Sequence, residues 1–443
     1  MTPASKKILS AGLVLAGLFT AMLLLGELRR AVPAFLLLYG LAFAVYAWTV
    51  REVLLDAKAF ATPVALLGFA LLFRAILFFS APSLSDDIYR YVWDGMLVNH
   101  RVNPYQYAPG APELGGLRDA LHARINHPDI GTPYGPVLMG VFAAVETVAH
   151  SVYAMKLPFL AFDVLTILLL WRLLDLTGRP RNRALIYAWN PLVVVEVAGS
   201  GHNDSAAIFL LLAAIYLLMR GRGRLSAAGL AVAVAAKYFA VLFLPALWKR
   251  LDRTKWLILP LGLALLFLPF YRALDSHLAS VFTVGANWRF NDSLFTLFHF
   301  ITGSAAVAKT IAAAGFAVVA IAVYRSGMPV LKGALWLIGA ALLLTSTLHP
   351  WYLLWLLPFL CFYPQRAWIL LTGLVMLSYQ VLMRYTAEGV WEESLWIKLL
   401  IYVPFFAVLS VDAWRGYRTR AAKMGSESFF SPNLLLKGGM TKK

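Results

Sequence analysis

Long apolar runs recur along the whole chain. They lie near 8–26, 31–50, 59–80, 153–175, 183–199, 205–219, 256–271, 304–324, 333–347, 352–363, 367–384 and 395–413. Most of these runs have the length that crosses the hydrocarbon core of a bilayer as an α-helix. The pattern therefore predicts an all-α polytopic membrane protein with a bundle of about 12–14 transmembrane helices.

Two stretches depart from this simple pattern. The segment 137–150 is apolar but short, and we expect it to lie along the outer interface or to dip into it. The stretch 225–248 has a basic loop at each end, Arg220–Arg224 and Lys249–Lys255, so both ends should lie on the cytoplasmic side. This arrangement predicts a re-entrant hairpin that turns near Lys237.

The basic residues give the orientation. The net charge is +17, and most Lys and Arg residues sit in short loops between apolar runs. Such loops are typical of the cytoplasmic side, which argues against a nucleic-acid-binding role and predicts a cytoplasmic N-terminus. The mildly basic loop Glu27–Arg30 is the exception, because it falls outside. The other loops predicted outside are 81–136, 199–204, 272–303, 348–351 and 385–394.

Composition supports a membrane protein without a soluble domain. The chain has 443 residues, of which 61% are hydrophobic and 14% charged, and its mean hydropathy is +0.73. We expect one integral membrane domain over 1–423, a retained first helix and a flexible cytoplasmic tail over 424–443. Cys361 is the only cysteine, so neither disulfides nor a thiolate metal site is expected. No nucleotide-binding or zinc-protease motif is present, and we expect no metal and no cofactor.

The first outside loop carries a concentration of polar and aromatic residues. A helix should begin near Ser85, with Asp86 and Asp87 in its first turn, and helical spacing places Asp87, Arg90, Tyr91 and Asp94 on one face. A carboxylate beside a guanidinium at the edge of a membrane cavity can act as a general base for a hydroxyl. Helix capping and surface charge are the alternative roles for the acid pair.

The other outside loops add a few polar residues each. The second loop contains His202, Asn203 and Asp204, the third contains Arg289, and the fourth reads His349-Pro350-Trp351-Tyr352. Each also has an ordinary structural explanation: Asp204 can cap the next helix, and His349 can anchor the chain at the interface. Lys237 can reach an interface by snorkelling, although its position within an apolar run favours a cavity.

Several of these motifs occur together in one order. They are Asp87-Ile88-Tyr89-Arg90-Tyr91, Gly95, Asn103-Pro104-Tyr105, Thr132-Pro133-Tyr134-Gly135-Pro136, His202-Asn203-Asp204, Lys237 followed by Pro245, and His349-Pro350-Trp351-Tyr352. Over residues 80–360 the chain resembles GT-C glycosyltransferases, and most closely the bacterial polyprenol-phosphate-mannose-dependent mannosyltransferases.

The resemblance implies a GT-C-like bundle and an inverting glycosyltransferase. Such an enzyme moves a hexose, with mannose favoured, from a polyprenyl-phosphate donor to a hydroxyl of a glycolipid, glycan or protein acceptor. Its general base falls on Asp87, and because the acids are adjacent, Asp86 can exchange roles with it. Members of this group usually carry the loop after the first span. Here it follows the third, which adds an N-terminal hairpin or exposes an error in the span count.

The chemistry that the resemblance implies assigns roles to the other residues. The leaving phosphate needs cations, and the candidates are Arg90, Lys237, Arg289 and His349. The candidates for sugar and acceptor binding are Trp93, Asp94, Tyr134, His202, Asn203, Asp204, Trp351 and Tyr352. A groove open to membrane lipids should hold the polyprenyl chain. We expect the enzyme in the cell (inner) membrane, with its active site facing the outside or periplasm.

Two other classes of protein remain as alternatives. A polytopic transporter or lipid flippase also places charges at membrane depth, but it should show internal repeats and mid-bilayer charges. In this sequence the acids gather in outside loops and no fixed-period repeat is found. A structural subunit of an envelope-assembly complex would use the same residues only as interfacial anchors.

Overall fold

The fold is helical throughout the described residues. The computed structural model describes residues 3–56 and 63–428, and within these ranges the only β-type pairing is an isolated bridge between Phe290 and Thr347. The α-helices are α1 Pro3–Leu24, α2 Val32–Leu55, α3 Pro63–Phe78, α4 Asp87–Asn99, α5 Pro136–Glu146, α6 Val152–Leu176, α7 Leu185–Ala188, α8 Pro191–Val193, α9 Asp204–Met219, α10 Gly223–Ala236, α11 Leu244–Leu247, α12 Arg253–Trp256, α13 Ile258–Phe267, α14 Leu274–Asn287, α15 Leu294–Thr302, α16 Ala305–Ser326, α17 Val330–Leu344, α18 Leu357–Leu360, α19 Arg366–Leu374, α20 Val381–Glu388 and α21 Leu395–Ser428.

Many of these helices can cross a membrane. In the described part of the chain, seven helical stretches are long and apolar enough to do so, and an eighth is the pair Pro191–Gly199 and Asp204–Met219, which bends by 117°. Four further apolar helices, α3, α5, α10 and α17, are shorter. The prediction of an all-α polytopic membrane protein is confirmed. The long stretches are fewer than the predicted spans because several apolar runs are broken or short.

The run predicted as a span over 352–363 is one of these exceptions. It forms a 3₁₀ turn, Pro350–Trp355, followed by the single helical turn α18. Pro358 lies within it, and Pro350 and Pro364 flank it. Each proline lacks the backbone N–H that a continuous helix needs. The segment is almost entirely buried, so it fills the interior of the bundle instead of crossing the bilayer as a helix.

The re-entrant hairpin is present. α10 packs against α9 and ends at Lys237, where the backbone becomes extended and the 3₁₀ turn Tyr238–Phe243 leads back into α11. At the other end, Gly223 lies against Lys255 and Leu251, so the two basic loops meet on one side. A helix of 14 residues rises about 21 Å, less than the ~30 Å of a bilayer core. The turn at Lys237 therefore lies inside the depth of the bundle.

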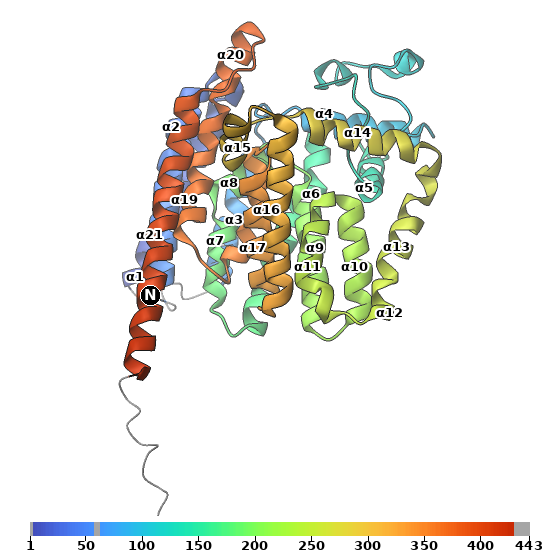
Figure 1. The fold of residues 1–443 in the computed structure, drawn as a ribbon. Helices are drawn as coiled ribbons and strands as arrows, with labels where there is room; N and C mark the ends of the chain where they lie inside the picture. Colours follow the sequence, from blue (N-terminus) through green and yellow to red (C-terminus); the bar gives the residue numbers. More distant parts are fainter. Residues whose placement is uncertain (1–2, 57–62, 429–443) are drawn as a thin grey trace, which may run out of the picture.

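The two ends of the bundle differ (Figure 1). α1 begins and α21 ends towards the lower end, where α12 also lies, while α4, α14 and α20 gather at the upper end. α5 dips from the upper end into the bundle beneath α4, as expected for 137–150. The N-terminal hairpin α1–α2 packs on itself and on α3, so the first large loop does follow the third helix.

Some predictions fall beyond the structure. The start of the predicted span 59–80, up to residue 62, and residues 429–443 lie outside the described residues. α21 continues to Ser428 and so includes the first residues of the predicted tail. Within the bundle, a buried ion pair between Arg74 and Asp163 ties α3 to α6, and Tyr187 donates a hydrogen bond of 2.7 Å to the same carboxylate. This ion pair holds α3, the helix that leads into the first outside loop, against α6.

Candidate active site

The two adjacent acids at the start of α4 have different surroundings. Asp86 is the N-cap residue, and its Oδ1 lies 2.7 Å from the guanidinium of Arg29, in the turn between α1 and α2. The same guanidinium donates to the carbonyl of Ser83, and burial raises the pKa of Asp86 while Arg29 opposes that shift. The helix begins slightly later than expected from the sequence, and the hydroxyl of Ser85 accepts a hydrogen bond from the backbone N–H of Asp87. Asp86 thus binds Arg29 and holds the N-terminal hairpin against the start of α4.

Asp87 has no Lys or Arg partner among the described residues. Its Oδ1 lies 3.5 Å from the amide nitrogen of Asn126, and its Oδ2 lies 3.8 Å from Nδ1 of His202. The side chain of Asp87 is 24% exposed, whereas His202 is fully buried. Asp87 is therefore a carboxylate at the start of a helix, reachable from outside and backed by an imidazole.

Behind His202 lies a buried acid that sequence reasoning missed. Glu196 is fully buried in a π-helical turn, Val194–Gly199, and its Oε2 lies 3.3 Å from Nε2 of His202. Tyr379 donates a hydrogen bond of 2.8 Å to the other oxygen. Both the π-turn and an ionisable residue inside an apolar run are common at functional sites, and the second was visible in the sequence.

An aromatic stack covers the other side of His202. The ring of Trp351 lies between those of His202 and His349, with centroid distances of 4.0 and 4.3 Å. Tyr352 meets Trp351 edge-on and stacks on Trp355. Burial, with smaller contributions from His202 and Lys237, lowers the pKa of His349 to about 3. His349 is therefore neutral at pH 7 and does not supply the positive charge expected from sequence.

Lys237 reaches this cluster from the turn of the hairpin. Its Nζ lies 2.6 Å from Oδ2 of Asp204 and 3.2 Å from Oδ1 of Asn203. Trp355 donates its indole N–H to the other oxygen of Asp204. Asp204 is fully buried at the first turn of α9, while the Lys237 side chain is 21% exposed. The two residues form a half-buried ion pair whose ammonium still faces the site.

Four other predicted residues belong to the scaffold of the first loop. Arg90 pairs with Asp94 at 2.9 Å and donates to the carbonyl of Ile130, and both side chains are buried. Burial raises the pKa of Asp94, while Arg90 opposes that shift. Trp93 packs against His122 of the same loop, with the two rings tilted by 56°. Tyr134 meets Tyr91 edge-on and accepts a hydrogen bond at its backbone carbonyl from Tyr105.

The third loop closes the cluster from another side. Arg289 pairs with Asp292 at 2.9 Å and keeps 39% of its side chain exposed. Its neighbours reach the rest of the cluster, because Phe290 packs on His349 and Trp288 on His127 of the first loop. The structure therefore brings Asp87, the 202–204 loop, Lys237, Arg289 and the 349–352 segment to one region. Burial raises the pKa of Tyr352 in this region, and the negative charges of Asp204 and Asp87 raise it further.

The arrangement combines an accessible base with cations and flat rings. A carboxylate that has no Lys or Arg partner can take a proton from a hydroxyl, and partly exposed Lys237 and Arg289 can meet an anion. An aromatic face suits the apolar face of a sugar, but both faces of Trp351 are covered by His202 and His349, so only its edge could meet one. Within residues 3–56 and 63–428, no three His, Cys, Asp or Glu side chains are close enough together to hold a metal ion.

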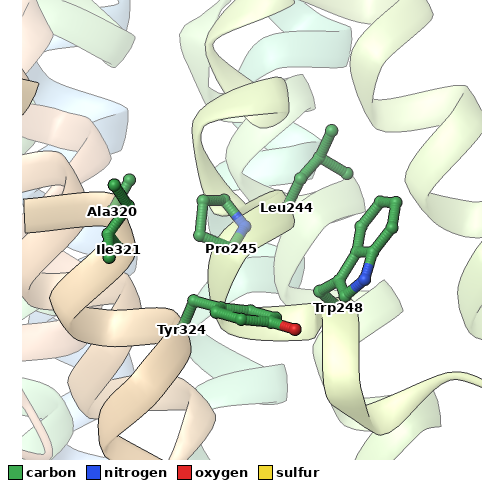
Figure 2. Close-up of a pocket in the computed structure, with 6 residues that line it drawn as sticks. All are labelled: Leu244, Pro245, Trp248, Ala320, Ile321 and Tyr324. Atoms are coloured by element: carbon green, nitrogen blue, oxygen red, sulfur yellow. The ribbon is translucent and has the colours of Figure 1, made fainter. Parts of the chain in front are cut away.

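A separate cavity lies towards the basic end of the hairpin (Figure 2). It has a volume of about 350 Å³ and is lined by apolar and aromatic side chains of α11, α16 and the residue after α11: Leu244, Pro245, Trp248, Ala320, Ile321 and Tyr324. Lys249 lies 4.3 Å above the ring of Tyr324. None of the predicted site residues lines this cavity, so it is distinct from the cluster around Asp87.

Comparisons with known proteins point to one enzyme family. Alpha-(1->6)-mannopyranosyltransferase A of Mycobacterium tuberculosis is 30% identical over 242 residues, which cover 52% of this chain and 46% of that protein. The proteins named alpha-(1->6)-mannopyranosyltransferase A and B of Corynebacterium glutamicum are 27% and 26% identical over 38% and 43% of this chain. These two matches span 35% and 34% of those proteins, so every match covers less than half of the relative. No solved structure matches.

A family model described as alpha-(1->6)-mannopyranosyltransferase, N-terminal domain, matches residues 8–251. The matched region begins within α1, so the N-terminal hairpin belongs to the family pattern, and it includes Asp87, His202 and Lys237. The resemblance to bacterial mannosyltransferases of the GT-C type is confirmed. Since the model matches more than half of its length, the chain belongs to the alpha-(1->6)-mannopyranosyltransferase family.

Proposed function

We propose that this protein transfers mannose from a polyprenyl-phosphate donor to a hydroxyl group at the outer face of the membrane. Family membership and the names of the relatives support mannose as the sugar. The donor class comes from the GT-C resemblance of the external motifs. Basic loops at the opposite end of the bundle from Asp87 support an outward-facing site in the cell membrane.

One observation carries the choice of Asp87 as the general base. Of the other acids near this region, Asp86, Asp94, Asp204 and Asp292 are each paired with a cation at 2.6–2.9 Å, and Glu196 is fully buried. A carboxylate held by a guanidinium or ammonium is a poorer proton acceptor, because the opposite charge favours its ionised form. Asp87 is partly exposed and is faced only by His202 and Asn126, which leaves it available for a substrate hydroxyl.

The reaction is a single displacement at the anomeric carbon. The acceptor oxygen forms the new bond to that carbon while its proton passes to Asp87. The bond between the anomeric carbon and the phosphate oxygen breaks, and the electron pair stays on the lipid phosphate. Because the acceptor attacks opposite to the leaving group, the configuration at the anomeric carbon is inverted.

The leaving phosphate then meets the cations that remain reachable. Lys237 and Arg289 are partly exposed, whereas Arg90 is buried against Asp94 and His349 is neutral. Charge-assisted contacts to the phosphate oxygens stabilise the negative charge that develops there. Trp351 and Tyr352 meet edge-on, and Asn203 accepts a hydrogen bond from Lys237; these three residues are the proposed contacts of the sugar and the acceptor.

The test compares the two adjacent acids. Asp87→Asn keeps the size of the side chain but removes the base, so turnover with polyprenyl-phosphate mannose should fall by about 10²–10⁴-fold, while donor binding persists. Asp86→Asn, which only weakens the contact with Arg29, is the matched control and should cost much less. Near-normal turnover in Asp87→Asn, or a larger loss in Asp86→Asn, would show that the base is not Asp87.

A further inference from the structure

Glu196 is buried at the centre of the site region without a cation beside it. Its carboxylate lies in the π-helical turn before the 202–204 loop and is fully buried. Tyr379 donates a hydrogen bond of 2.8 Å to Oε1. Oε2 lies 3.3 Å from Nε2 of His202, within ion-pair distance, and makes no hydrogen bond among the described residues. Burying a carboxylate without a cation costs free energy, and ionisable residues at such positions in membrane proteins commonly mark functional sites.

His202 connects this acid to Asp87. Its ring is fixed by stacking on Trp351 at 4.0 Å, and its Nδ1 lies 3.8 Å from Oδ2 of Asp87. Neither ring nitrogen makes a hydrogen bond in the described part of the chain, so its contacts with the two carboxylates are ion-pair distances of 3.3 and 3.8 Å. Asp87, His202 and Glu196 therefore form a row of carboxylate, imidazole and carboxylate that runs from the exposed edge into the buried interior.

The row determines which ring nitrogen carries the proton. An ionised carboxylate only accepts hydrogen bonds, so Glu196 favours the tautomer of His202 with hydrogen on Nε2. Nδ1 then presents its lone pair towards Asp87. Carboxylates behind a histidine commonly fix the tautomer and raise the basicity of the ring in this way. Asp87 is only partly packed, so a rotation of its side chain would bring Oδ2 from 3.8 Å to hydrogen-bond distance of Nδ1.

We propose that Glu196 is a positioning residue that makes His202 the proton acceptor for Asp87. This inference rests on the proposed function. The acceptor hydroxyl gives its proton to Asp87, and the carboxyl group passes it to Nδ1 of His202. Asp87 is thereby ionised again, and the imidazolium lies between two carboxylates. When the products leave, the proton returns through Asp87 to water, and each group recovers its starting state.

The first measurement reads the tautomer directly. Nitrogen NMR of the full-length protein in lipid, with ¹⁵N-labelled histidine and His202 assigned by difference from His202→Gln, should show hydrogen on Nε2. In Glu196→Gln the amide group can donate to Nε2, so the proton should move to Nδ1. A wild-type ring with its proton on Nδ1, or a folded Glu196→Gln protein that keeps hydrogen on Nε2, overturns the inference.

The second measurement reads turnover and its pH profile. Glu196→Gln should lower kcat by about 10–100-fold with little change in KM for polyprenyl-phosphate mannose, and should alter the dependence of kcat on pH between 5 and 8. Tyr379→Phe keeps the carboxylate and should cost less. Glu388→Gln, at an exposed acid paired with Arg384, is the matched control and should leave kcat unchanged. A folded Glu196→Gln protein with normal kcat and pH profile contradicts the proposal.

The two proposals fail in different ways. If the wild-type protein moves no mannose from the lipid donor, the proposed function fails, while the NMR measurement still tests the role of Glu196. If Glu196→Gln does not fold, the inference is tested by the tautomer of His202 in the wild-type protein and by the turnover of Tyr379→Phe. A wild-type proton on Nδ1, or an unchanged pH profile in Tyr379→Phe together with unchanged kcat, then counts against the inference.

Discussion

Lys237 holds a carboxylate that water does not reach. Asp204 is fully buried, and besides the indole N–H of Trp355 its partner is the ammonium of Lys237 at 2.6 Å. Removing one member of a buried ion pair is more harmful than removing both, because the remaining charge is left without compensation. Lys237 therefore contributes to the stability of the bundle as well as facing the site.

Lys237→Ala should therefore destabilise the protein as well as weaken donor binding. The expected cost is about 3–5 kcal/mol, the range for breaking a buried pair. Thermal unfolding of the purified protein measures it. The double variant Lys237→Met with Asp204→Asn should recover much of the loss, since no charge is left buried.

A second lysine provides the matched control. Lys255 also pairs with an aspartate, Asp252, but that pair is largely exposed, and Lys255→Ala should change stability by only about 0–1 kcal/mol. Equal losses for Lys237→Ala and Lys255→Ala would show that the pair with Asp204 is not a buried one.

At the scale of elements, α4 is positioned by close backbone contacts. A Cβ atom on Gly95 would lie 2.5 Å from the carbonyl oxygen of Phe142 in α5, and one on Gly135 would clash with the carbonyl of Ala235 at the end of α10. Gly95 lets α5 approach α4, the helix that carries Asp87, and Gly135 lets the hairpin approach the start of α5. The motif glycines in the sequence thus have a packing role.

Gly95→Ala should separate α4 from α5. Overpacking of this kind typically costs about 1–3 kcal/mol, and it should also reduce turnover because Asp87 moves with its helix. Gly140→Ala, on α5 itself, is the control, since a Cβ atom there meets nothing within 4 Å. Thermal unfolding and transfer activity of the two variants should differ clearly. Equal behaviour would mean that the α4–α5 contact is looser than described.

The outer part of the first loop is held by a histidine. His150, after α5, lies 2.6 Å from Asp119 and 2.7 Å from Glu146. Hydrogen bonds and charge from these acids raise the pKa of His150, although burial opposes the shift, and hydrogen bonds lower the pKa of Asp119 against the effect of its burial. The contact should be strongest where His150 is protonated and Asp119 is ionised.

The loop should consequently loosen as pH rises. A raised pKa means that the stabilisation by His150 is complete below its unfolded value of about 6.5 and is lost as pH passes the raised value. The contribution of Asp119 has the opposite sign and is lost only in acid, below about pH 4. Hydrogen exchange of residues 112–124 should accelerate between pH 6.5 and 8.5, after correction for the intrinsic rate. His150→Gln should remove this dependence, whereas His100→Gln, whose ring contacts only a backbone carbonyl, should keep it.

For the whole molecule, the sequence predicted the membrane bundle better than the site. Apolar run length depends on the bilayer and is read directly from the chain, as the helices α1, α2, α6 and α21 show. The prediction of a span over 352–363 was wrong, because prolines in and beside this run interrupt the helix that its hydropathy indicates. Site residues are harder, because spacing allows several partners and packing chooses among them. Arg90 has Asp87 one turn before it and Asp94 one turn after it, and the folded structure pairs it with Asp94. Glu196 lies behind His202 because of a π-helical turn that the apolar pattern does not indicate.

The predicted orientation can be tested by cysteine labelling. Cys361 is buried, so the parent protein should give little background. Cysteines at exposed Arg118 and Glu388 should react with a membrane-impermeant reagent in intact cells, and those at Gly221 and Asp252 only after permeabilisation. Reaction of all four positions from the same side would contradict the topology.

The contact between Arg29 and Asp86 has a consequence for how the chain enters the membrane. In the proposed orientation the loop Glu27–Arg30 must be translocated, although two of its four residues are arginines. Glu27 neutralises Arg30 at once, but Asp86 is synthesised 57 residues after Arg29. During synthesis Arg29 is therefore carried outward with no fixed counterion. The first hairpin should insert slowly or reversibly until α3 and the start of α4 emerge, which makes Asp86 a determinant of biogenesis as well as of the folded state.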